Sequence, residues 1–188
     1  MEQQYLSHSA GETEQIAADF AAGLKSGDVI AYKGPMGAGK TAFTRGLCRG
    51  LGLDESQVSS PTFALVHQYG NGEHALYHFD MYRGESYEDL YSTGFFDYLD
   101  YGGILAIEWS ENIESVLPPN TITVEISRPQ EGDDPDLRRI LIRRPGFFYL
   151  TFFKEVQYSN FIDGHFLRPG FLRSAGGRPA NRAVLHRR

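Results

Sequence analysis

Cysteine is almost absent from this sequence of 188 residues, in which Cys48 is the only one. A single cysteine excludes an internal disulfide and a cysteine-rich zinc site. We interpret Cys48 as a small buried hydrophobic residue on a helix. Long apolar runs are absent as well, because the longest lie within residues 147–153 and fall far short of the roughly 20 residues of a membrane helix. We therefore expect no membrane span.

We also expect no secretory signal. The first residues, Met1-Glu2-Gln3-Gln4-Tyr5, have neither a basic start nor an apolar core. We therefore expect the protein to stay in the cytoplasm. Hydrophobic residues make up 41% of the chain and charged residues 22%, which is typical of a globular protein. The length suits one ordinary domain.

Positive charge is scarce over most of the chain. Residues 1–144 carry 11 Lys and Arg against 22 Asp and Glu, a net charge of −11, whereas residues 145–188 carry 7 against 2, a net charge of +5. An acidic body argues against broad electrostatic binding of nucleic acid, since such binding depends on phosphate neutralisation by Lys and Arg. We expect any contact with RNA to run through a partner or through the basic tail.

The composition changes sharply after Arg144. Acidic residues nearly vanish, aromatic residues cluster in residues 147–153, and Arg, Gly and Pro dominate from Arg168 onward. We place the end of the folded domain near residue 144. Three interpretations of residues 145–188 stay open: an added structural layer, a flexible basic arm, or an appendage that is not native.

Apolar periodicity predicts an alternation of helices and strands in residues 1–144. Helices are predicted at residues 12–25, 41–51, 85–91 and 95–99. Strands are predicted at residues 29–32, 63–69, 75–79, 103–108, 121–127 and 137–143. Asn71-Gly72 is a hairpin signal, so we expect the second and third of these strands to be antiparallel. The series predicts an α/β fold of three layers with a mixed parallel and antiparallel sheet.

A phosphate-binding motif lies between the first predicted strand and the second predicted helix. The segment Gly34-Pro35-Met36-Gly37-Ala38-Gly39-Lys40-Thr41 fits G-x-x-x-x-G-K-[ST] without a mismatch. Backbone N–H groups of such a loop form a nest for phosphate at the positive end of a helix dipole. Lys40 can reach the β- and γ-phosphates, and Thr41 can offer its hydroxyl to Mg²⁺. The motif predicts nucleotide binding.

Acidic residues follow two of the predicted strands. Glu108 ends the run that starts at Ile104, and Asp80 follows Phe79. Ligands gather at the carboxyl ends of strands in open α/β sheets, and phosphoryl transfer needs a metal anchor and an oriented water. We therefore choose Glu108 and Asp80 as candidates, with solvated strand-end carboxylates as the alternative. His78 is interpreted as a structural hydrogen-bonding residue, because no second His or Cys stands at metal-ligand spacing.

The order and spacing of these residues resemble the bacterial TsaE family, the P-loop ATPase needed for tRNA threonylcarbamoyladenosine formation. The resemblance covers roughly residues 5–144. Its motifs are the phosphate loop with Phe43-Thr44-Arg45-Gly46, Ser59-Ser60-Pro61-Thr62-Phe63, His78-Phe79-Asp80-Met81-Tyr82-Arg83 and Ile107-Glu108-Trp109. It implies an ATPase that acts with the TsaD and TsaB proteins. TsaD transfers the threonylcarbamoyl group to an adenosine beside the anticodon, so contact with tRNA would be indirect.

The resemblance also implies roles for individual residues. Lys40 would be the phosphate ligand, Thr41 a magnesium ligand, and Glu108 the acid at the metal or the attacking water. Asp80 would be the second functional acid. The ATP cradle would be formed by Gly37, Ala38, Gly39, Lys40, Thr41 and Ala42.

Five further residues are candidates for contact with ATP, each with a simpler alternative. Thr62 lies where a switch-like loop would meet the γ-phosphate, or is an ordinary turn threonine. Trp109, the only tryptophan, lies beside the nucleotide or packs in the core. Candidates for the adenine pocket stand at the start of the first helix, where helix capping explains them equally well: Ser9, Glu12 and Thr13.

Three other functions compete with an ATPase. A small-molecule kinase needs an arginine-bearing lid, and residues 84–127 offer no Arg-rich segment. A GTPase normally has an Asn-Lys-x-Asp motif, which the sequence lacks, and Arg83 stands where a D-x-x-G switch motif has Gly. The third alternative is a nonenzymatic scaffold that binds ATP only to hold a partner. Phosphate release with and without partners would separate the scaffold from the ATPase.

Overall fold

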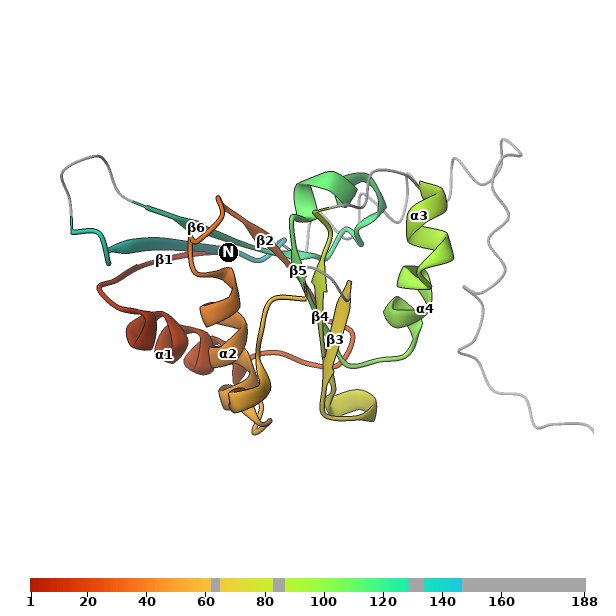
Figure 1. Cartoon of the computed structure of the whole chain (residues 1–188), viewed down its shortest axis with the longest axis horizontal. Coiled ribbons are helices and arrows are strands. Elements are labelled where there is room, and N and C mark those ends of the chain that lie inside the picture. Colours follow the sequence, from red (N-terminus) through yellow and green to blue (C-terminus); the bar gives the residue numbers. More distant parts are fainter. Residues whose placement is uncertain (62–64, 83–86, 129–133, 147–188) are drawn as a thin grey trace, which may run out of the picture. The chain divides into compact units, whose positions relative to one another are not determined.

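Seven strands form one mixed sheet in the computed structural model, which describes residues 1–61, 65–82, 87–128 and 134–146 (Figure 1). The strands are β1 (Glu2–Ser7), β2 (Val29–Lys33), β3 (Val66–Tyr69), β4 (Leu76–Asp80), β5 (Ile104–Glu108), β6 (Ile122–Ser127) and β7 (Arg138–Arg143). Their order in the sheet is β1-β7-β6-β2-β5-β4-β3. The neighbours β6, β2, β5 and β4 are parallel, whereas β1, β7 and β6 pair antiparallel, as do β4 and β3.

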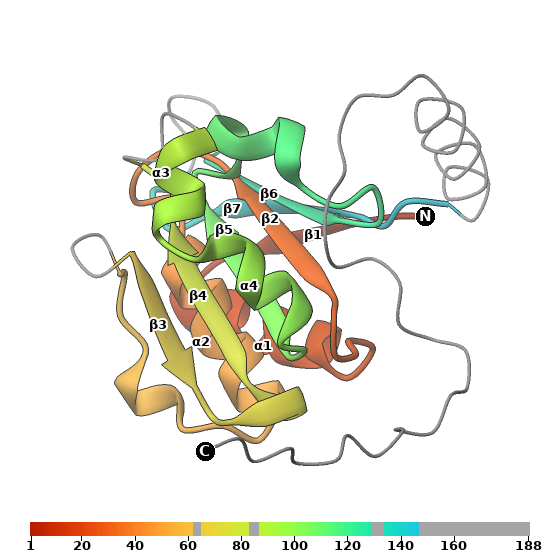
Figure 2. The ribbon, with the colours of Figure 1, turned by 90° about the vertical axis from the view of Figure 1, so that its right-hand side faces the viewer.

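Helices cover both faces of this sheet. They are α1 (Ala10–Ala21), α2 (Lys40–Gly50), α3 (Tyr87–Ser92) and α4 (Phe95–Asp100), with 3₁₀ turns η1 (Glu55–Gln57), η2 (Gly72–His74) and η3 (Ser110–Val116). Helices α1 and α2 lie on one face, and α3 and α4 lie on the other (Figure 2). The predicted three-layer α/β fold with a mixed sheet is therefore confirmed.

The central strands are apolar throughout because each of their faces is covered. In β5, Ile104 and Ala106 belong to the core beneath α1 and α2, whereas Leu105 and Ile107 belong to the core beneath α3 and α4. Successive side chains of a strand point to opposite faces, so a strand between two helical layers has no polar face. This burial explains why the run before Glu108 is continuous rather than alternating.

The predicted strands and helices are all present with shifted ends, but the sequence pattern missed β1. Most of its side chains are exposed, and only Ser7 is fully buried, so the segment carries no alternating apolar signal. Pairing with β7 makes it a strand, with Glu2 opposite Arg143. The helix after it begins at Ala10, because the Ser9 hydroxyl accepts a hydrogen bond from the Glu12 N–H at 3.1 Å.

The hairpin between β3 and β4 is antiparallel as predicted, but its turn is longer than the Asn71-Gly72 signal suggested. The connection contains the 3₁₀ turn η2 (Gly72–His74), and Gly70 and Gly72 both have positive φ. Residues 147–188 lie outside the described residues, so the domain boundary near residue 144 stays a prediction. None of the helices in the described part of the chain has the length and apolar character that a membrane crossing requires.

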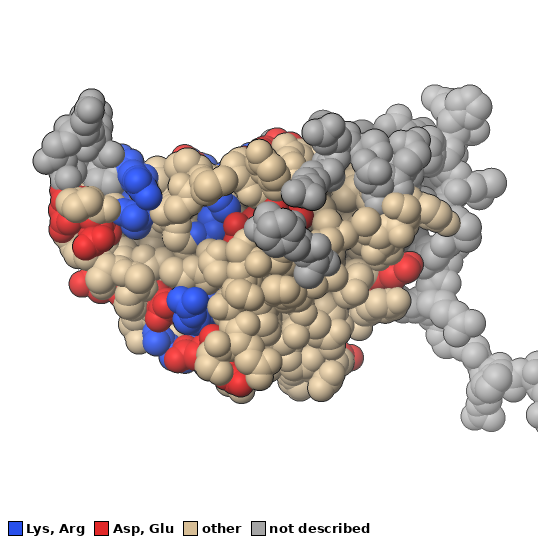
Figure 3. Space-filling model, viewed as in Figure 1, with Lys and Arg blue, Asp and Glu red and all other residues tan. Residues whose placement is uncertain are grey.

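Charged side chains on the surface of α1 and α2 occur beside partners of opposite sign. Arg45 contacts Glu14 at 2.9 Å, and Arg49 lies 3.8 Å from Glu55 in η1. Basic and acidic areas alternate on the face seen in Figure 3. Such exposed pairs contribute little to stability, roughly 0–1 kcal/mol each.

The close contact between α1 and α2 depends on Gly46. A Cβ atom added there would lie 2.1 Å from the Glu14 carbonyl oxygen and 2.6 Å from the Ala17 Cβ. No side chain larger than hydrogen fits unless the two helices separate. Because α2 follows the phosphate loop directly, this contact also fixes where that loop sits on the sheet.

Replacing this glycine tests the contact. We expect Gly46→Ala to lower the free energy of unfolding by about 1–3 kcal/mol, because overpacking outweighs the helix propensity that alanine gains. Gly11→Ala is the matched control, since the nearest atom to its added Cβ is 3.9 Å away. Urea unfolding should find Gly11→Ala at least as stable as the parent chain. Equal stability of the two variants would contradict the close-packing argument.

Candidate functional site

The carboxyl ends of three parallel strands meet at one edge of the sheet. Strand β2 leads into the phosphate loop, and β4 and β5 end at Asp80 and Glu108, which stand opposite one another in the ladder. A pocket of about 350 Å³ opens at this edge. Its lining residues are Met36, Gly37, Lys40, Thr41, Ser60, Asp80, Tyr82, Glu108 and Trp109. The pocket thus brings together the phosphate loop and both predicted acids.

The phosphate loop turns sharply between β2 and α2. Gly34 and Gly39 have φ of +142° and +116°, and a Cβ at Gly34 would overlap the Ile126 carbonyl oxygen. These positions therefore require glycine. Lys40 is 5% exposed, and its ammonium donates to the carbonyl oxygens of Gly34 and Pro35 at 3.0 and 3.1 Å. The loop holds its own lysine over the pocket.

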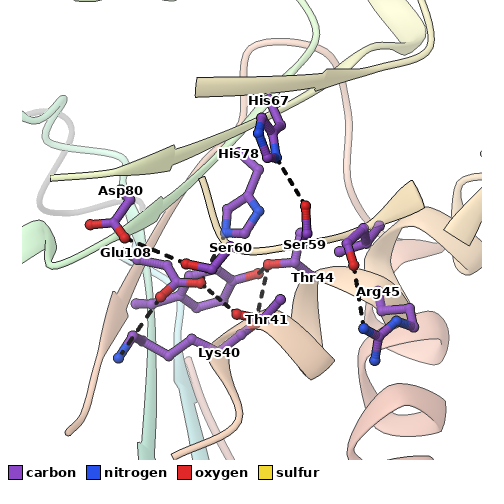
Figure 4. A network of polar contacts seen from close by, with 12 residues as sticks. Lys40, Thr41, Thr44, Arg45, Ser59, Ser60, His67, His78, Asp80 and Glu108 are labelled. Carbon is purple, nitrogen blue, oxygen red and sulfur yellow. Dashed lines mark hydrogen bonds and ion pairs between the residues drawn. The ribbon is translucent and has the colours of Figure 1, made fainter. Parts of the chain in front are cut away.

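Glu108 is the centre of a buried polar network (Figure 4). Its Oε1 accepts a hydrogen bond from the Thr41 hydroxyl at 2.9 Å and contacts His78 Nε2 at 3.0 Å. Its Oε2 lies 4.0 Å from the Lys40 ammonium. Burial opposes ionisation of this carboxyl, but the His78 contact, the Thr41 hydrogen bond and the Lys40 charge together hold the pKa of Glu108 below its usual value. The site therefore contains a stabilised carboxylate.

Asp80 faces the same pocket from the neighbouring strand. Its Oδ1 accepts the Tyr82 N–H at 3.0 Å, and the Ser60 hydroxyl lies 3.5 Å from its Oδ2 (Figure 4). Asp80 is 6% exposed. The Ser60 contact brings the end of β4 next to the segment before Pro61.

Trp109 forms a wall of the pocket directly after β5. Its backbone adopts a left-handed conformation with φ of +57°, which is uncommon for a bulky residue. The indole ring centroid lies 4.8 Å from the Lys40 ammonium and 5.1 Å from the Tyr82 ring. Trp109 also packs against the core beneath α3 and α4, which was the alternative for this residue. Contact with nucleotide itself stays a prediction.

The start of α1 shows the capping arrangement that was the alternative for the three adenine-pocket candidates. Ser9 caps the helix, and the Glu12 carboxylate accepts the His8 N–H at 2.7 Å. The Thr13 hydroxyl lies 2.8 Å from that of Ser7. None of the three lines the described pocket, and their contact with adenine stays a prediction.

The structure also adds residues to the site. Ser60 and Tyr82 line the pocket although the sequence interpretation gave them no role, and the signal was their place in the Ser-Pro-Thr and His-Phe-Asp motifs. His78, predicted to form structural hydrogen bonds, does so with Glu108 itself. Thr62 lies outside the described residues, and Ala42 is half-buried near the start of α2.

The oxygen atoms of Thr41 and Glu108 are the donors that suit Mg²⁺ in this pocket. Hydroxyl and carboxylate oxygens are the hard ligands that Mg²⁺ prefers, and it retains several waters and takes phosphate oxygens. The two residues are already 2.9 Å apart. No cluster of three or more His, Cys, Asp or Glu suited to a metal occurs in the described ranges. The donor set therefore fits a metal that a nucleotide helps to hold.

The sheet order, the phosphate loop and the acid at the end of β5 define the class of protein: the chain has the P-loop NTPase fold. It belongs to the TsaE family, since the family model described as "Threonylcarbamoyl adenosine biosynthesis protein TsaE" matches residues 7–139. The resemblance stated from the motifs is confirmed, and the family is one of tRNA threonylcarbamoyladenosine biosynthesis.

Similar proteins and a solved structure agree with this assignment. A TsaE protein of Bacillus subtilis is 43% identical over 124 residues, which are 65% of this chain and 75% of that protein. A TsaE protein of Treponema pallidum is 37% identical over 128 residues, or 68% of this chain and 93% of that one. The crystal structure of YdiB from Bacillus subtilis matches with a TM-score of 0.61 and 31% identity, covering 85% of this chain and 97% of that chain.

The charge of Glu108 predicts a pH-dependent contribution to stability. The pKa of Glu108 in the folded state lies below the ordinary 4.5, so its carboxylate stabilises the fold at pH values above 4.5. This stabilisation is lost as the pH falls through the folded-state pKa. We expect Glu108→Gln to be less stable than the parent chain at pH 7, with the difference shrinking below pH 4.5. Urea unfolding of both chains from pH 7 to pH 3, in the presence of a chelator, measures this difference in the free energy of unfolding. A difference that stays constant over this range would contradict the charge argument.

Proposed function

We propose that this chain binds ATP with Mg²⁺ and hydrolyses it as the ATPase component of tRNA threonylcarbamoyladenosine biosynthesis, acting with TsaD and TsaB. The observation that carries the proposal is the Thr41–Glu108 hydrogen bond of 2.9 Å. It joins the last residue of the phosphate loop to the acid at the end of β5. The names of the relatives, tRNA threonylcarbamoyladenosine biosynthesis protein TsaE, support the pathway.

In this proposal the phosphate loop binds the triphosphate. Backbone N–H groups at the start of α2 receive the phosphate oxygens, since the first N–H groups of a helix have no partner within it. Lys40 exchanges its hydrogen bonds to the Gly34 and Pro35 carbonyls for the β- and γ-phosphates. The pocket volume of about 350 Å³ is of the size that small-molecule sites have.

Hydrolysis then needs an oriented water and a stabilised leaving group. A water attacks the γ-phosphorus, the bond to the bridging oxygen of ADP breaks, and ADP and inorganic phosphate leave. Thr41 and Glu108 would hold Mg²⁺, which neutralises charge developing on the phosphates. Glu108 and Asp80, opposite one another at the ends of β5 and β4, are the groups that can orient the water.

The proposal assigns the contact with tRNA to the partners rather than to this domain. Residues 1–144 carry a net charge of −11, and acidic and basic areas alternate on the face in Figure 3. The partner surface would border the segments that touch nucleotide, namely residues 59–62 and the end of β4. Ser60 and Asp80 are already in contact there, so nucleotide state could be passed to a bound protein.

Two substitutions test the catalytic assignment. We expect Lys40→Ala to lower kcat/KM for ATP by about 100-fold or more, because one preorganised charge at the phosphates is lost. Glu108→Ala should retain most nucleotide affinity and lose hydrolysis. Lys33→Ala and Glu114→Ala are matched controls, since these residues form a half-exposed ion pair of 2.9 Å away from the pocket lining.

Phosphate release and calorimetric ATP binding measure both effects. If Glu108→Ala hydrolyses ATP as fast as the parent chain, Asp80 would be the group that orients the attacking water. Binding of ATP without turnover in any condition, partners included, would favour the nonenzymatic scaffold. A kcat/KM for ATP in Lys40→Ala equal to that of the parent chain would contradict the proposal itself.

Partner dependence is tested separately. We expect weak ATPase activity alone and stimulation by TsaD and TsaB, because in this proposal the nucleotide cycle of the domain serves a reaction that another protein carries out. The full chain and a chain truncated after Arg144 are compared, each with and without partners. Stimulation of both assigns the activity to the domain, and loss on truncation assigns residues 145–188 to the interface. The absence of stimulation in both would refute partner coupling.

A further inference from the structure

Two arginines, one in β7 and one just after β6, reach the carbonyl oxygens of the phosphate loop. Arg138, the first residue of β7, donates from Nε to the Ala38 carbonyl at 3.0 Å. Arg128, just after β6, donates from Nη2 to the Gly37 carbonyl at 3.3 Å. The residues of the Arg138–Ala38 contact are 100 positions apart in the chain. Neither arginine is among the residues that line the described pocket.

We propose that Arg138 is a positioning residue that fixes the peptide between Ala38 and Gly39, so that the Gly39 N–H faces the phosphate site. The inference rests on the proposed binding of ATP. In a trans peptide the C=O of one residue and the N–H of the next point in opposite directions. Because Arg138 holds the Ala38 carbonyl and does not line the pocket, the Gly39 N–H, on the opposite side of this peptide, would point toward the pocket.

The loop needs such a constraint because its glycines impose little order. Gly39 has φ of +116°, a conformation that glycine reaches readily and also leaves readily. An anion nest requires several N–H groups to converge, so rotation of one peptide removes a donor and turns a carbonyl oxygen toward the phosphates. A hydrogen bond from a charged guanidinium opposes that rotation.

Arg138 is itself held rigidly enough to do this. Its Nη1 donates to the carbonyl oxygens of Pro135 and Leu137 at 2.7 and 2.8 Å, so three carbonyls fix one guanidinium. The planar fork of arginine loses less entropy per hydrogen bond than a flexible ammonium would. On the other side, β1 pairs with β7 and places Ser7 opposite Arg138. The guanidinium is therefore anchored to the sheet, and the loop is anchored to the guanidinium.

A second close contact seats the loop on the same strands. Gly34 lies so near the Ile126 carbonyl that no Cβ fits between them, and Ile126 pairs with Ile140 in β7. The loop is thus held against β6 at its beginning and by a β7 side chain near its end. Strand β7 contributes to the nucleotide site through this contact although it is two strands away from β2 in the sheet.

The experiment compares nucleotide binding with stability in the full chain. Arg138→Ala and its neighbour Arg139→Ala, an exposed arginine on the same strand, are made alongside the parent chain. Calorimetry gives the Kd for ADP and ATP, and thermal unfolding gives Tm with and without ADP. We expect Arg138→Ala to raise the Kd for ADP and for ATP about tenfold. The rise in Tm that ADP produces should become smaller in this variant. Arg139→Ala should match the parent chain.

A merely structural role would have a different signature. It would lower the Tm of the Arg138 variant without nucleotide and leave the ADP-induced rise and the Kd unchanged, which would overturn the inference. If Arg138→Ala does not fold, Arg138→Gln is compared with the parent chain in the same way. We expect a smaller loss of nucleotide affinity in this variant. Wild-type affinity in Arg138→Gln would overturn the inference. Failure of the parent chain to bind ATP or ADP would refute the proposed function instead.

Discussion

One oxygen atom, Oε1 of Glu108, joins the parts of the structure on which the site depends. It is within 3.0 Å of donors from α2 and from β4, while Glu108 itself ends β5. A carboxylate that is 5% exposed is costly unless hydrogen bonds and opposite charge compensate it. Thr41, His78 and Lys40 supply that compensation, so the buried charge links β4 and the start of α2 to the end of β5.

The parts of the site that the sequence predicted are those in which local pattern and chemistry coincide. The loop from Gly34 to Thr41 carries its own conformational requirements, and a strand and a helix flank it as the motif demands. Asp80 and Glu108 were found because each ends an apolar run, and parallel pairing of β4 and β5 brings such ends together. Neither inference needed contacts between distant segments, apart from that parallel pairing.

What the sequence did not predict depends on contacts between distant segments. Strand β1 has mostly exposed side chains and becomes a strand through pairing with β7, about 140 residues further along. The reach of Arg138 to Ala38 is equally non-local, and no spacing rule connects an arginine at the start of one strand to a carbonyl in a loop. The left-handed backbone of Trp109 is a third case, because β-strand periodicity carries no information on the residue that follows.

The conformation of Trp109 shows how such a non-local requirement enters the site. A positive φ at a bulky residue costs of order 1–3 kcal/mol and persists only where surrounding contacts require it. Here the chain must turn from β5 into η3, where the Ser110 hydroxyl donates to the buried Tyr32 carbonyl at 2.9 Å. The turn places the indole over Lys40 and against Tyr82. The strained residue thus connects the phosphate-loop strand, the acid of β5 and the pocket wall through contacts that a local secondary-structure pattern does not encode.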